Sequence, residues 1–197
     1  MADQQPRLIT LAGSTRATSV NKKLARLAAD RAQGAGADAA FLDLADYPMP
    51  IYDGDLEDSQ GMPEAAHELK ARLRASDGFL IVSPEYNSSL PPVLKNALDW
   101  VSRRESADEP FLAAYRGKVA ALMAASPSGM GGMRGLVPLR MMLGNIGVHV
   151  VPDQFTLPRA FDAFDEADGL ADGEQAERLT AVAEAWVATA ARLGQPG

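Results

Sequence analysis

The stretch "GFLIVS", Gly78 to Ser83, constrains the fold more than any other part of this 197-residue sequence. It is apolar at consecutive positions rather than at alternate ones, and a strand of this kind is buried on both faces. A parallel sheet that is covered by helices on both sides provides such an environment. The run therefore predicts a central strand of an α/β protein.

Four further apolar runs have the length of a strand, and helical patterns alternate with the strands along the chain. The predicted strands lie within 8–11, 39–44, 78–83, 118–126 and 147–151. The predicted helices begin near Val20, Met62, Leu94, Leu136 and Leu179. This alternation predicts an open α/β sandwich that forms a single domain over residues 1–197. The segment from Tyr47 to Met62, with its prolines and acidic residues, is expected to be a long loop.

Three loops after predicted strands have unusual compositions. They read "GSTRATSVN" after the first strand, "PEYNSSLPP" after the third and "SPSGMGGMRG" after the fourth. Ligands of open α/β sheets bind outside the carboxyl ends of the strands, near the point where the strand order reverses. With a strand order of 2-1-3-4-5, these three loops meet at one edge of the sheet. The sequence thus predicts one site built from three loops.

The first loop has the residue types of an anion site. Ser14, Thr15, Thr18 and Ser19 offer hydroxyl groups, the helix that follows offers free backbone N–H groups, and Arg16 offers a fork of donors. Capping of the helix by Thr18 or Ser19 is the alternative, but it explains only one of these residues. The spacings GxxxxGK[ST] and GxGxxG are both absent after the first strand. A monophosphate is therefore the ligand that fits best.

The second loop offers groups that suit a planar ligand. Tyr86 could present a flat face and Asn87 an amide, although Asn87 and Ser88 are also typical turn residues. Glu85 is either a proton donor or a loop acid that is exposed or ion-paired. Trp100, in the helix that follows, is expected in the core or at a subunit interface.

The composition excludes several classes of protein. The chain has no cysteine, so it has no disulfide, thiol nucleophile or cysteine-based metal site. The formal net charge of −7 argues against a nucleic-acid partner, and no apolar run approaches the roughly 20 residues of a membrane helix. The start "MADQQPRLIT" lacks the features of a secretory signal. We expect a cytoplasmic protein without a metal and without a membrane partner.

The first two loops together resemble a known family. "GSTRATSVNKKLA" and "SPEYNSSLPPVLKNALDW" match without a gap the patterns GSxRxxSxN and PEYNxSxPxxLKNAxDW of the NAD(P)H-dependent FMN reductases, which include quinone, chromate and azo-dye reductases. The glycine-rich third loop is also similar, and the resemblance runs from about Leu8 to Val151. It implies a flavodoxin-like three-layer sandwich, with a five-stranded parallel sheet of order 2-1-3-4-5 and helices on both faces.

The resemblance also implies which residues bind the cofactor FMN. Those expected at the FMN phosphate are Ser14, Arg16, Ser19 and Asn21. Those expected around the isoalloxazine ring are Pro84, Glu85, Tyr86, Asn87 and Ser88, with Ser126 and Gly129 on its other side. Pro127 and Ser128 depart from the more glycine-like entry that is typical of the third loop in the family.

The activity that the resemblance implies is transfer of a hydride from NADPH or NADH to bound FMN, and then to a small electron acceptor, by a ping-pong mechanism. Candidate acceptors are quinones, flavins, azo compounds and metal oxyanions. No catalytic side chain is expected, because the flavin carries the chemistry. The resemblance further implies a homodimer or homotetramer, with an interface at the helix over 94–103 and at the one after Met133. A flavodoxin-type one-electron carrier and a flavin-binding regulatory module are the alternatives.

Overall fold

A computed structural model describes residues 5–194 of the chain. Its five strands form one parallel sheet in the order β2-β1-β3-β4-β5, which confirms the predicted order. The strands are β1 (Arg7–Ala12), β2 (Asp38–Leu42), β3 (Gly78–Val82), β4 (Val119–Ala125) and β5 (His149–Leu157). Because the order reverses between β1 and β3, the carboxyl ends of these two neighbouring strands form the expected place for a ligand.

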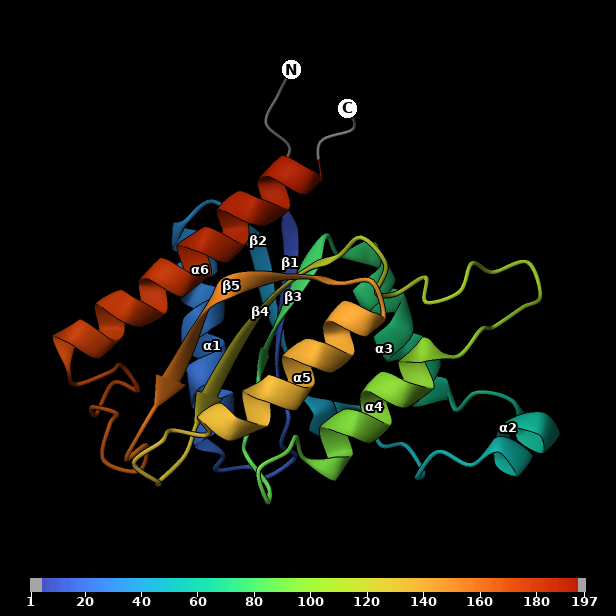
Figure 1. The fold of residues 1–197 in the computed structure, drawn as a ribbon, viewed down its shortest axis with the longest axis horizontal. Coiled ribbons are helices and arrows are strands. Elements are labelled where there is room, and N and C mark those ends of the chain that lie inside the picture. The colour runs from blue at the N-terminus through green and yellow to red at the C-terminus, as the bar shows by residue number, and fades with distance from the viewer. Residues whose placement is uncertain (1–4, 195–197) are drawn as a thin grey trace.

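Two layers of helices enclose the sheet (Figure 1). One face is covered by α1 (Val20–Gly34) and α6 (Gly173–Leu193). The other face is covered by α3 (Glu64–Ala75), α4 (Pro92–Ser102) and α5 (Met133–Asn145). Within the described residues, no helix has both the length and the apolar character needed to cross a membrane.

Each face of the sheet has its own hydrophobic core. Strand β3 is buried at every position, as its sequence predicts, and its side chains alternate between the two cores. Phe79 and Ile81 pack against α3 and α4, whereas Leu80 and Val82 pack on the side of α1 and α6. Trp100 of α4 is fully buried, and its indole N–H donates to the Pro50 carbonyl at 2.8 Å. This confirms the core placement of Trp100.

Two segments differ from the sequence prediction. The stretch predicted as a loop from Tyr47 to Met62 contains a helix, α2 (Gly54–Gln60), and a short 3-10 helix, η1 (Leu44–Asp46), precedes it. Helix α2 buries none of its residues, so it has no apolar periodicity, and the Asp53 carboxylate begins it by accepting from the Asp55 and Leu56 N–H groups.

Strand β5 is also longer than the predicted run over 147–151, since it continues to Leu157. It is an edge strand, and its register with β4 shifts between Ala120 and Leu122. Polar residues at exposed positions, together with Pro152, break the apolar run within it. Such residues are tolerated at an edge and at a bulge, where the ladder of hydrogen bonds is incomplete.

Candidate functional site

The three loops meet at the carboxyl ends of β1, β3 and β4, as the sequence predicts. They surround one cavity of about 170 Å³. The predicted site residues that line this cavity are Ser14, Arg16, Ser19, Asn21, Pro84, Glu85, Tyr86 and Ser126. Three others, Asn87, Ser88 and Gly129, do not line it. We call this space the three-loop cavity.

The first loop brings its donors to the start of α1. The backbone N–H of Arg16 donates to Ser14 Oγ at 3.3 Å, and the Nε of Arg16 donates to Thr18 Oγ1 at 3.1 Å. Ser19 is the N-cap residue of α1, but its hydroxyl makes no capping hydrogen bond. The capping alternative therefore does not account for Ser19. A helix start with an uncommitted hydroxyl and a nearby arginine suits a phosphate, because the N-terminal N–H groups and the helix dipole favour negative charge.

Gly13 allows the first loop to begin so close to its neighbours. Its N–H donates to the Val82 carbonyl at 2.9 Å. A Cβ at this position would lie only 3.0 Å from Leu94 Cδ2 and 3.3 Å from Pro84 Cδ. A larger residue would push the first loop away from α4 and from the second loop.

Asn21 joins the first loop to the third. Its side chain is 3% exposed, its Nδ2 donates to the Ala125 carbonyl at 2.9 Å, and its Oδ1 accepts from the Ala125 N–H at 2.9 Å. Both ends of the amide are thus committed to the last residue of β4. This arrangement supports a positioning role for Asn21 beside, or in place of, the phosphate contact that the family resemblance implies.

A buried lysine that sequence reasoning missed, Lys22, holds the first loop in place. Lys22 Nζ lies 2.7 Å from Asp43 Oδ1 and donates to the Thr15 carbonyl at 3.2 Å. It therefore holds the backbone of the first loop against the segment that follows β2. A lysine in an amphipathic helix normally lies at the surface, and no feature of the sequence signals that this one is buried.

The second loop is a two-residue hairpin turn. Tyr86 and Ser89 exchange backbone hydrogen bonds of 2.9 and 3.0 Å, and the two residues between them have φ angles of 51° and 65°. Asn87 and Ser88 are therefore the corner of the turn, in the left-handed region that such turns require. Their contact with the isoalloxazine stays a prediction, whereas Tyr86 lies at the three-loop cavity with 53% of its surface exposed.

Glu85 links the second loop to the start of α5. Its carboxylate accepts from the Arg134 backbone N–H at 3.1 Å and from the Arg134 Nε at 2.7 Å. This confirms the interpretation of Glu85 as an ion-paired loop acid. The pair fixes the second loop and thereby orients the residues on either side of Glu85.

The third loop is anchored to the end of β5. The Ser126 N–H donates to the Leu157 carbonyl at 3.1 Å, and the Ser126 hydroxyl lies 3.2 Å from the Ser128 hydroxyl. Gly131 has a φ of +61°, and a Cβ there would lie 2.9 Å from the Leu157 carbonyl carbon. Only glycine fits this turn. Gly129 is exposed on the outer part of the loop, and its predicted ring contact stays a prediction.

Phe161 is a residue of the three-loop cavity that sequence reasoning missed. It comes from the loop after β5 and lines the three-loop cavity together with Tyr86. It lies in the segment "LPRAFDAFDEADG", in which no motif was recognised, so neither spacing nor periodicity singled it out.

A larger cavity of about 280 Å³ lies between the segment after β2 and α4, and Thr15 is one of its lining residues. Tyr47, Met49 and Asn96 are among its lining residues, and no arginine or lysine is. Asn96 is engaged there with the Tyr52 N–H and the Pro50 carbonyl. The smaller three-loop cavity is therefore the better candidate for an anionic cofactor.

Comparisons with known proteins identify relatives of this chain. Residues 6–162 match the family model of the NADPH-dependent FMN reductases. The chain is 37% identical over 136 residues to a quinone reductase of Escherichia coli, which covers 69% of this chain and 68% of that one. It is 33% identical over 175 residues to an NAD(P)H-dependent FMN reductase of Pseudomonas aeruginosa, covering 88% of this chain and 89% of the relative.

Solved structures give the same result. The flavoenzyme NAD(P)H:(acceptor) oxidoreductase FerB from Paracoccus denitrificans superimposes with a TM-score of 0.78 at 27% identity, over 95% of this chain and 98% of that chain. An archaeal flavodoxin superimposes with a TM-score of 0.60 at 10% identity, over 93% of this chain and 98% of that one, which shows the shared fold.

The order of the strands and the two layers of helices define a flavodoxin-like protein, and the three-loop cavity lies at the reversal of its strand order. The chain belongs to the NADPH-dependent FMN reductase family. FMN as cofactor and NAD(P)H as co-substrate are thereby confirmed at the level of the family, and so is the expectation of an enzyme.

The residues present fit FMN. The hydroxyls and Arg16 at the start of α1 suit its phosphate, and the loops that carry Tyr86 and Ser126 suit a flat ring. A volume of 170 Å³ is below the 300–1,000 Å³ typical of sites that enclose a whole ligand. The cavity is therefore too small to enclose all of FMN, and part of the bound cofactor would lie outside it.

Proposed function

We propose that this chain transfers a hydride from NADPH or NADH to a small electron acceptor, with FMN held in the three-loop cavity. The observation that carries the proposal is the meeting of Ser19, Arg16 and Tyr86 around one cavity at the reversal of the strand order. FMN, when bound, supplies the chemistry of accepting and donating the hydride. Donor and acceptor are proposed to use the same open mouth in turn, which gives ping-pong kinetics.

In this proposal the residues of the chain bind FMN and orient the two reactants. Arg16, Ser14 and Ser19 bind the phosphate, with the first N–H groups of α1. Pro84, Glu85, Tyr86 and Ser126 line the ring, and Asn87, Ser88 and Gly129 are further proposed ring contacts outside the lining of the cavity. The rate is expected to come from holding the two reactants in a productive orientation, an effect of position rather than of a catalytic side chain.

The kinetic test varies NADPH at several fixed concentrations of an acceptor. Parallel double-reciprocal lines are expected for a shared mouth, and intersecting lines would contradict the alternate use of one site. Comparison of NADH with NADPH, against a quinone, an azo dye, free flavin and chromate, identifies the substrates. A flavin-loaded protein without turnover would instead support a one-electron carrier or a regulatory module.

Arg16→Ala is expected to weaken FMN binding by about 1.5–3 kcal/mol, roughly 10- to 150-fold, because a charged hydrogen bond to the phosphate is lost. Titration of the apoprotein with FMN, followed by quenching of flavin fluorescence, measures the change. Arg31→Ala, at the other end of α1, is the matched control and should leave the affinity unchanged. An unchanged FMN affinity in the Arg16 variant would overturn the assignment of the phosphate site.

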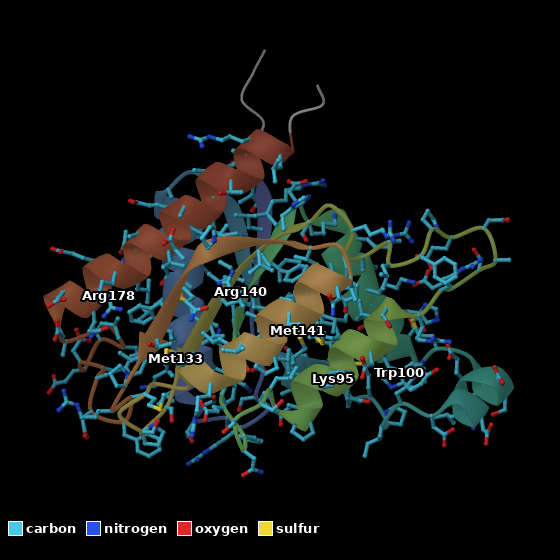
Figure 2. The ribbon with its side chains drawn as sticks, viewed as in Figure 1. Lys95, Trp100, Met133, Arg140, Met141 and Arg178 are labelled. Atoms are coloured by element: carbon cyan, nitrogen blue, oxygen red, sulfur yellow. The ribbon has the colours of Figure 1, made fainter. Side chains whose placement is uncertain are left out.

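The proposal includes a homodimer or homotetramer, with an interface centred on α5. Met133, Val137 and Met141 recur every four residues on α5 and are exposed, which forms an apolar stripe on the outer face of this helix. Figure 2 shows Met133 near the start of α5 and Met141 further along α5, where this helix runs beside α4 and its exposed residue Lys95. An exposed apolar stripe of this kind is typical of an interaction surface.

The double variant V137E/M141E is expected to shift the protein toward the monomer, because it places two charges in a buried apolar contact. Light scattering after size-exclusion chromatography measures the mass. Leu193→Glu, at an exposed apolar position near the end of α6, is the control and should keep the oligomer. A wild-type monomer, or an oligomer that survives in V137E/M141E, would contradict the proposed interface.

A further inference from the structure

The loop over residues 158–163, after β5, adds an aromatic ring to the three-loop cavity. Phe161 lines this cavity and is 66% exposed. Tyr86 lines the same cavity and is 53% exposed. Single apolar residues at a surface are ordinary, so exposure alone carries no conclusion. Two exposed aromatic rings at one cavity are a different observation, because they give its mouth a binding surface.

Phe161 is not required for packing. Its neighbours Ala160, Ala163 and Phe164 belong to, or pack against, the hydrophobic core on the side of α1 and α6, whereas Phe161 does not. The loop thus directs Ala160, Ala163 and Phe164 toward the core and leaves the ring of Phe161 exposed at the cavity. Folding of the domain provides no reason for a phenylalanine at this position.

The backbone that carries Phe161 is held in place. The Ala160 N–H donates to the Ser126 carbonyl at 3.1 Å, and the Asp162 N–H donates to the Arg159 carbonyl at 3.1 Å. Ala160 is fully buried. The Cα of Phe161 therefore keeps its position relative to the third loop. An aromatic side chain has only two rotatable bonds, so it loses little conformational entropy when a ligand binds against it.

We propose that Phe161 and Tyr86 form an aromatic rim that binds the flat face of an aromatic electron acceptor, and that Phe161 thereby favours planar aromatic acceptors over compact inorganic ones. This inference rests on the function proposed above and specifies the substrate class of the same site. Aromatic rings gain about 0.5–1.5 kcal/mol from offset or edge-to-face contact beyond the burial of area. A compact inorganic anion has no flat face and gains nothing from either ring.

The experiment compares two acceptors in the FMN-loaded enzyme, a naphthoquinone and ferricyanide, with NADPH as donor. Phe161→Ala is expected to raise KM for the naphthoquinone by about two- to tenfold, the equivalent of one aromatic contact. With FMN at saturation, the value of kcat/KM for ferricyanide is expected to fall by a clearly smaller factor than that for the naphthoquinone, because ferricyanide gains no aromatic contact. Phe161→Tyr, which keeps the ring, should restore the naphthoquinone KM.

Phe111→Ala is the matched control. Phe111 is also exposed, but it lies in the segment between α4 and β4, against Arg104, and does not line the three-loop cavity. Phe111→Ala should leave the KM for the naphthoquinone and the kcat/KM for ferricyanide unchanged. A measurement without turnover is the affinity of the FMN-loaded protein for 2-naphthol, a flat ring that accepts no hydride, and Phe161→Ala should weaken it by the same factor.

An unchanged naphthoquinone KM and 2-naphthol affinity in Phe161→Ala would overturn the inference. Equal losses with both acceptors, together with weaker FMN binding, would also overturn it, because Phe161 would then be a contact of the cofactor. A wild-type protein that reduces neither acceptor would contradict the proposed function, and the 2-naphthol titration would still decide whether the rim binds flat aromatic molecules.

Discussion

Replacing Lys70 with methionine is expected to lower the free energy of unfolding by about 3–5 kcal/mol, because the change leaves a buried carboxylate without its main partner. The Lys70 side chain is 1% exposed, and its Nζ lies 2.6 Å from Oε2 of Glu109, whose side chain is 5% exposed. The same Nζ donates to the Arg103 carbonyl. Lys70 thus ties α3 to the segment after α4, and urea unfolding near neutral pH measures the loss.

The effect of this variant is expected to depend on pH through Glu109. Burial alone would raise the pKa of Glu109, but hydrogen bonds from Lys70 and the Glu105 N–H, together with the charges of Lys70 and Arg74, outweigh burial and lower the pKa. A lowered pKa stabilises the fold above the ordinary carboxyl value of 4.5, and this stabilisation is lost as the pH falls through the folded value. The difference in free energy of unfolding between the wild type and K70M should therefore become smaller as the pH falls below the ordinary carboxyl pKa of 4.5.

Lys95→Met is the matched control for Lys70→Met. Lys95 is half-exposed on α4 and pairs with Asp99 one turn away at 2.7 Å. Exposed pairs of this kind contribute only about 0.3–0.5 kcal/mol. The double variant K70M/E109L, which removes both charges, should recover part of the stability that K70M loses. A K70M protein as stable as K95M at neutral pH would contradict the role assigned to Lys70.

The fold was predictable where burial determines residue type. The consecutive apolar residues of β3 and the helical spacing after Val20 reflect surfaces that are removed from water, and these elements lie where the sequence predicts them. Helix α2 was missed because it buries nothing, so only its capping aspartate could have indicated it. Lys70 was missed because a charge within an amphipathic helix carries no sign that a later segment will fold over it.

The sequence predicted which loops meet at the site, but it did not predict where each side chain points. Residue type and spacing identify which loops hold donors, since the strand order brings those loops together. They do not distinguish an amide that faces a ligand from one that bonds to the backbone, and both amide ends of Asn21 bond to Ala125. Phe161 lies in a segment with no periodic pattern, so only the structure brings it to the three-loop cavity.

Asn21→Leu is expected to lower the free energy of unfolding by about 2–5 kcal/mol, because the N–H and carbonyl of Ala125 lose their partner in a buried place. It is also expected to weaken FMN binding, since Ala125 lines the three-loop cavity and leads directly into Ser126. Urea unfolding of the apoprotein measures the first effect, and the FMN titration used for Arg16 measures the second.

Asn145→Leu, at the exposed end of α5, is the control and should change neither property. Asn21→Asp keeps an oxygen for the Ala125 N–H, but its ionised carboxylate buries a charge and sets an oxygen against the Ala125 carbonyl, so this variant should also be less stable than the wild type. If Asn21 only contacted the phosphate, Asn21→Leu would still weaken FMN binding, but the apoprotein would be as stable as the wild type. The unfolding of the apoprotein therefore decides whether Asn21 acts on the cofactor directly or holds the first and third loops in the positions that bind it.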